Sequence, residues 1–183
     1  MAGRKDAATE GQRTAASDPA AVHEAGHAVV AVLLGLKASA RIEHGSPGCG
    51  TCDIDVPGGP GGVDRLLVAL VAGGEAEGRL LGQPRRWLAS TEDAKAMLRV
   101  VGPLTRPGAA DRIARAKREA AHLLREPRVW RATESVAIEL GRRPLVPDAR
   151  VRDAVTEAGL APGVSPFAGS SARRSPASQD RTR

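Results

Sequence analysis

The segment "AVHEAGHAVVAVLLG", from Ala21 to Gly35, constrains this chain more than any other feature. It follows Ser17-Asp18-Pro19, which offers an N-cap side chain and then a proline near the first turn. It ends at a glycine, so it predicts a helix of about four and a half turns. His23 and His27 stand four residues apart, and residues at that spacing share one face of a helix. The sequence therefore places two imidazoles together on a helix that is otherwise suited to a buried core.

Together with Glu24, these histidines form the pattern HExxH, which is typical of zinc hydrolases. Two imidazoles on one helix face can ligate zinc, and the adjacent glutamate can reach a water on the same metal. Such a water attacks a polarised carbonyl once the glutamate has taken its proton. Composition alone predicts roughly 0.005 such patterns in a chain of this kind. The alternative is a helix with two solvated or core histidines.

A third zinc ligand must come from elsewhere in the chain, because a catalytic zinc has three protein ligands and an open position. His44 and His122 are weak candidates, since one falls in an expected hairpin and the other in mid-helix. Asp93 stands at the start of an expected helix and offers a carboxylate. It would equally complete a capping box with Ser90, so the pattern alone leaves both roles open.

The rest of the sequence predicts a mainly α-helical fold with a small β-hairpin. Aromatic residues make up 2% of the chain, so Ala, Val and Leu must build the core, which favours closely packed helices. Alternation around Ile42 and Ile54 predicts two short strands between residues 37 and 57. Further helices are expected over residues 63–81, 88–102, 109–124, 129–143 and 148–159.

One domain is expected over residues 17–160, between a disordered segment at 1–16 and a disordered basic tail at 161–183. No apolar run approaches the roughly 20 residues that span a bilayer, and no signal-peptide core is present. With two cysteines, Cys49 and Cys52, a cytoplasmic location is expected. Their CxxC pattern is compatible with two free thiols, a redox pair or half a zinc site.

The formal net charge of +6 would suit an acidic partner such as nucleic acid or an anionic membrane. Arg supplies all but four of the 27 positive charges, and neither a helix-turn-helix nor a basic stripe is evident. We therefore expect no nucleic-acid partner and no membrane span.

At this point a family resemblance becomes visible. "AVHEAGHAVVAVLLG" resembles the HEAGHA helix of the peptidase domain of FtsH-type ATP-dependent zinc metalloproteases. "LVALVAGGEAEGRLLG" is similar to the family's LAGRAAEELVFG helix, and "ASTEDAKAM" to its GASNDLxxA segment. "ARIEHGSPGCGTCDIDVP" resembles the family's strand pair, although Gly50-Thr51 fits its Gly-x-Thr motif only loosely. The resemblance covers residues 20–158.

The resemblance implies a zincin-type helical peptidase domain that hydrolyses peptide bonds in unfolded or flexible proteins. It implies that His23 and His27 bind Zn2+, that Glu24 is the catalytic base and that Asp93 is the third ligand. Glu77 matches a family glutamate near the site, where it would anchor the second ring nitrogen of a ligand histidine. A solvated helix charge is the alternative for Glu77.

The sequence also departs from that family. The family joins this domain to a membrane anchor and an AAA+ ATPase, whereas this sequence holds no GxxxxGK[ST] loop. Gly74, Glu75, Gly78 and Arg79 differ from the family's pattern. Hexamer formation and ATP coupling are therefore open, and a separate ATPase or further copies of this chain are candidate partners.

Unfolded polypeptides are the expected substrates, and a strand near Ile42 would offer its edge to an extended peptide. The alternative function is a non-catalytic, peptidase-like binding or scaffold protein. The intact set of four site residues argues against that alternative, because a site no longer used for catalysis would be expected to lose at least one of them by mutation.

Overall fold

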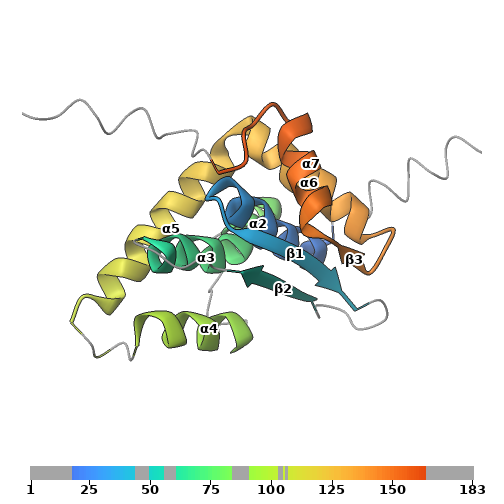
Figure 1. Cartoon of the computed structure of the whole chain (residues 1–183). Coiled ribbons are helices and arrows are strands. Elements are labelled where there is room, and N and C mark those ends of the chain that lie inside the picture. Colours follow the sequence, from blue (N-terminus) through green and yellow to red (C-terminus); the bar gives the residue numbers. More distant parts are fainter. Residues whose placement is uncertain are drawn as a thin grey trace, which may run out of the picture.

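The computed structural model describes residues 18–43, 50–55, 61–83, 91–102, 105 and 107–163. It is mainly helical with a small antiparallel sheet, which confirms the expected fold class (Figure 1). The helices are α2 (Pro19–Leu33), α3 (Gly62–Leu81), α4 (Thr91–Val101), α5 (Ala109–Arg125), α6 (Pro127–Leu140) and α7 (Asp148–Glu157). The strands are β1 (Lys37–Ile42), β2 (Gly50–Asp55) and β3 (Leu145–Val146). Residues 1–16 and most of the expected tail lie outside the described residues.

Helix α2 is the central element of the fold (Figure 1). It contacts α3, α6, α7 and both strands of the hairpin, and its residues from Ala28 to Leu33 are fully buried. Asp18 caps the helix by accepting a 3.0 Å hydrogen bond from the N–H of Ala20, and Pro19 occupies the first turn. The apolar run therefore forms a helix that is surrounded on all sides, as a helix without a polar face must be.

Helices α2 and α3 approach each other closely at Gly26. A Cβ atom at Gly26 would lie 2.6 Å from the Cβ of Ala76 and 3.0 Å from the carbonyl oxygen of Ala72. Small residues on both helices make this approach possible, and α3 gives up some helix propensity for it by carrying glycines. The approach brings the histidine-bearing face of α2 directly against α3.

The sheet has the strand order β2-β1-β3, and both pairings are antiparallel. Ala40 of β1 pairs with Cys52 on one side and with Val146 on the other. The prediction that the strand near Ile42 offers an open edge is therefore wrong, because β3 pairs with that side of β1. In this sheet β2 is an edge strand, and it contacts α2. Strand β3 has only two residues, too few to produce a recognisable alternation in the sequence.

The fifth and the third expected helices differ most in their bounds from those observed. The fifth was expected over 129–143, but α6 starts at Pro127, which is tolerated in a first turn, and ends at Leu140. The chain must be extended soon afterwards, because Leu145–Val146 pair with β1. The third starts at Thr91, and the proposed cap Ser90 lies outside the described residues. None of the described helices combines the length and the apolar character needed to cross a membrane.

We predict that Gly26→Val destabilises the protein by more than about 2 kcal/mol, because the added side chain must enter the space held by Ala76 and the backbone of Ala72. Urea denaturation measures this change. Ala114→Val, at an exposed position of α5, is the control and should change the free energy of unfolding by less than about 0.7 kcal/mol. Equal losses in the two variants would show that the α2–α3 contact is not tight.

Candidate metal centre

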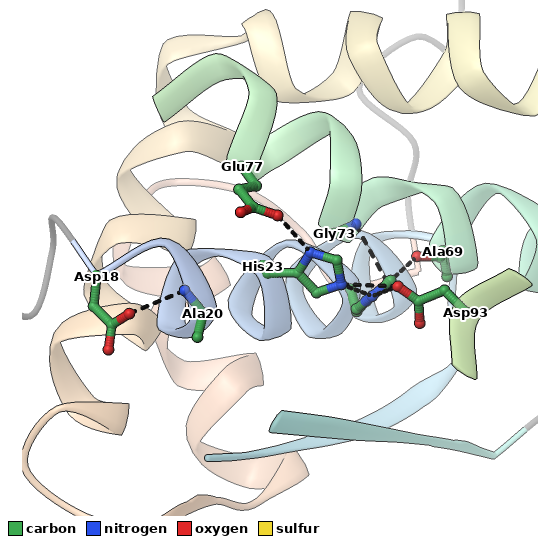
Figure 2. Close-up of polar contacts among 8 residues, drawn as sticks. Asp18, Ala20, His23, Ala69, Gly73, Glu77 and Asp93 are labelled. Carbon is green, nitrogen blue, oxygen red and sulfur yellow. Dashed lines mark hydrogen bonds and ion pairs between the residues drawn. The ribbon is translucent and has the colours of Figure 1, made fainter. Parts of the chain in front are cut away.

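Three ligand-type side chains from α2 and α4 converge beside α3 (Figure 2). His23 Nε2 lies 2.8 Å from Asp93 Oδ2 and 3.0 Å from His27 Nε2. The third separation, between His27 Nε2 and Asp93 Oδ2, is 3.4 Å. The tertiary structure thus brings together the two histidines of the HExxH pattern and the aspartate from 70 residues further along the chain. This group could hold a metal ion.

The second ring nitrogen of each histidine has its own partner. His27 Nδ1 lies 2.8 Å from the carbonyl oxygen of Ala69, which can only accept, and 3.3 Å from the backbone N–H of Gly73, which can only donate. The shorter contact assigns the hydrogen of the neutral ring to Nδ1. His23 Nδ1 lies 3.2 Å from Glu77 Oε2 and donates to it in the same way. Figure 2 shows Glu77 and Asp93 on opposite sides of the His23 ring. Both Nε2 atoms are then left with lone pairs that point at Asp93.

Three electron-rich atoms this close together require a positive charge between them. In a tetrahedral zinc site with bonds of about 2.0–2.1 Å, the ligand atoms lie about 3.3 Å apart. The separations of 2.8, 3.0 and 3.4 Å at this cluster lie around that value. The donor set of two imidazoles and one carboxylate therefore fits a small divalent cation in both chemistry and spacing.

A proton can take the same place when no metal is bound. Burial alone would lower the pKa of His23, but the hydrogen bonds to Asp93 and Glu77 outweigh it and raise the pKa to about 9. For Asp93, burial would raise the pKa of the carboxyl. Once the two rings are protonated, their hydrogen bonds to Asp93 and their positive charge instead hold that pKa well below its usual range. A metal ion must therefore displace a tightly held proton.

Glu24 is buried next to this cluster, with 7% of its surface exposed. Burial raises the pKa of its carboxyl, and the positive charges of His27 and His23 reduce that rise. It does not belong to the group of three convergent ligand atoms. Its place in the chain, one residue after His23, leaves it beside the cluster rather than in it.

Helix α3 forms the rear wall of the cluster. A Cβ atom at Gly73 would lie 2.6 Å from the Cδ2 atom of His27, so the imidazole lies directly on the α3 backbone. Glycines within a helix are compatible with a close approach by another element, but nothing in the sequence connects Gly73 with His27. The carbonyl of Ala69 leaves no signal in a sequence at all, because every residue has a carbonyl group.

The remaining sequence candidates lie apart from the centre or outside the described residues. His122 is an exposed residue of α5 and is not part of the convergent group. His44 and Cys49 are outside the described residues, so the CxxC pattern is seen only at Cys52. Burial and the nearby charge of Glu24 raise the pKa of the Cys52 thiol well above its usual range. Its thiol is therefore neutral, which does not favour a reactive thiolate.

No protein-family model matches the chain, and no curated protein matches it significantly. The resemblance to FtsH-type peptidases therefore stays a hypothesis that rests on the motifs quoted above. What the structure adds independently is the convergence of His23, His27 and Asp93.

We predict that zinc affinity rises with pH, because zinc must displace the proton of His23. Below a pKa of about 9 the affinity should increase about tenfold per pH unit, and it should level off above that pH. Competition with a chromophoric chelator between pH 6.5 and 9 measures this slope. An affinity that is constant over this range would contradict the protonated state of the metal-free cluster.

We also predict that Glu77→Ala weakens zinc binding by about 10- to 100-fold, because His23 would lose the partner that orients its ring. Glu75→Ala, two residues earlier on the same helix, is the matched control and should leave the affinity unchanged. The same chelator competition applies to both variants. If the two variants bind zinc equally well, Glu77 does not support the metal site.

Proposed function

We propose that this protein is a zinc-dependent metallopeptidase that hydrolyses peptide bonds in unfolded or flexible polypeptides. The observation that carries the proposal is the convergence of His23, His27 and Asp93 at 2.8–3.4 Å, next to the buried carboxyl group of Glu24. Metal ligands alone would suit a structural site. A glutamate that adjoins the ligands without joining them is what a hydrolytic site requires.

Zinc is the metal that best suits this donor set. Two imidazoles and one carboxylate are typical ligands of catalytic zinc, and three protein ligands leave a fourth position open. When bound, zinc lowers the pKa of water to about 7 and polarises a substrate carbonyl. His23, His27 and Asp93 would hold the ion, while Glu77 and the carbonyl of Ala69 would keep the two imidazoles oriented.

Glu24 would act as the general base. Its carboxylate would accept a proton from the attacking water and then donate it to the amine that leaves when the peptide bond breaks. Burial raises the pKa of Glu24, and a base whose pKa moves toward the working pH transfers protons in both directions more effectively. The same residue can therefore serve both proton transfers.

The proposed substrate class follows from strand β2, which starts at Gly50. Among the described residues β2 pairs with β1 alone, so its outer edge is available to an extended peptide. Edge pairing requires a segment whose backbone groups are free, which a stably folded protein does not offer. A separate ATPase would have to unfold any stable substrate first.

We predict that Glu24→Gln keeps one zinc per chain but loses about 100- to 10,000-fold of the casein-hydrolysing activity, because the amide cannot accept the proton. Elemental analysis gives the zinc content, and release of labelled fragments gives the activity. Asp93→Ala should bind zinc much more weakly, and His23→Ala should bind none. A Glu24→Gln variant as active as an active, zinc-loaded wild type would refute the role of Glu24 as the base. A zinc-loaded wild type that cleaves no substrate would refute the enzyme hypothesis and leave a zinc-binding scaffold.

A further inference from the structure

The first residue of β2, Gly50, lies directly against the side chain of Glu24. A Cβ atom at Gly50 would be 2.5 Å from Glu24 Cγ, 2.6 Å from Oε1 and 2.8 Å from Cδ. All three distances are too short for real contacts between these atoms. The bare backbone of Gly50 therefore leaves the space that the middle and the end of the Glu24 side chain occupy.

We propose that Gly50 is a positioning residue: because it has no side chain, the Glu24 carboxylate can lie beside the metal ligands. The proposal rests on the function proposed above, because it assumes that Glu24 is the base. Helix α2 fixes the Cα atom of Glu24 but leaves the torsions of its side chain free. A wall on the other side is needed to hold the carboxylate in one place, and Gly50 supplies it.

This wall is itself held in place by the sheet. Gly50 pairs with Ile42 of β1, and the N–H of Ile42 donates a 3.0 Å hydrogen bond to the carbonyl of Pro144. The strand that carries Gly50 is thus anchored through β1 to the chain segment that leads into β3. Because the backbone of Gly50 is held by the sheet, it cannot move to make room for an added Cβ. The side chain of Glu24 must move instead.

The presence of glycine here also needs a reason of its own. Glycine weakens a strand, and in strands it often marks a site where another group approaches closely. The approaching group at Gly50 is the candidate base. Alanine would suit the strand better, so any harm done by Gly50→Ala must come from the contact with Glu24 and not from strand propensity.

A thermal double-mutant cycle tests the contact without using activity. We expect Gly50→Ala to lower the Tm by about 5 °C in the zinc-loaded protein, and by less than about 1 °C when Glu24 is already alanine. Arg41→Ala, an exposed change in the same hairpin, should have the same small effect in both backgrounds. If Gly50→Ala fails to fold alone, recovery in the Glu24→Ala background supports the contact. Equal losses in both backgrounds, or failure of both proteins to fold, overturn it.

Peptidase kinetics test whether the contact positions the base. Gly50→Ala should keep one zinc per chain, since the three atoms nearest to the added Cβ all belong to Glu24 and not to a metal ligand. It should also keep KM within about twofold. Its kcat should fall by about 10- to 100-fold, as expected when a catalytic group is displaced by about 1 Å. Arg41→Ala should keep both constants. An unchanged kcat in Gly50→Ala, or a loss that lies entirely in KM, overturns the positioning role.

These measurements separate the two proposals. If the wild type cleaves casein and Glu24→Gln does not, but Gly50→Ala keeps the full kcat, only the inference about Gly50 fails. If the zinc-loaded wild type cleaves no substrate, the peptidase proposal fails. The positioning role then fails with it, even where the melting data show that Gly50 and Glu24 touch.

Discussion

The close contact between α2 and α3 is the constraint on which the rest of the structure depends. It exists because Gly26 carries no side chain, so that α2 can lie against Ala72 and Ala76. On α3, Gly73 follows Ala72 directly, and the His27 ring takes the place that its side chain would fill. A larger residue at Gly26 would push α2 away from α3, which carries the partners of both imidazoles, and a larger residue at Gly73 would displace the His27 ring. The close packing of α2 on α3 therefore also sets the geometry of the candidate metal centre.

The cluster at this contact places two imidazoles and a carboxylate where a proton or a metal ion can lie between them. The ring nitrogens that face away from Asp93 bond to Ala69 and Glu77, so the atoms that face Asp93 present lone pairs to its carboxylate. A proton relieves this repulsion in the metal-free protein, which is why the pKa of His23 rises to about 9. A divalent ion would relieve it better, because it can bind all three atoms at once. The same arrangement can thus hold a proton or a metal ion between the three side chains.

Local physics explains which parts of the fold could be predicted. The start signal in Ser17-Asp18-Pro19 and the apolar run after it were enough to predict α2. The alternation around Ile42 and Ile54 was enough to predict the hairpin. Strand β3 was missed because Leu145–Val146 is a strand only through its pairing with β1. The open edge was consequently assigned to β1 and not to β2. The end of the fifth helix was also misplaced: α6 ends at Leu140 with Gly141 as its C-cap residue, and β3 begins at Leu145.

By itself, the sequence determined the half of the centre that lies within one helix. His23 and His27 share a face because helix geometry fixes residues at that spacing, whatever surrounds them. The sequence could not decide between a ligand and a cap for Asp93, because both roles are possible at the start of a helix. Only the tertiary structure placed Asp93 2.8 Å from His23, and only it seated Glu24 against Gly50. Such contacts depend on how separate elements pack, and no local spacing encodes that packing.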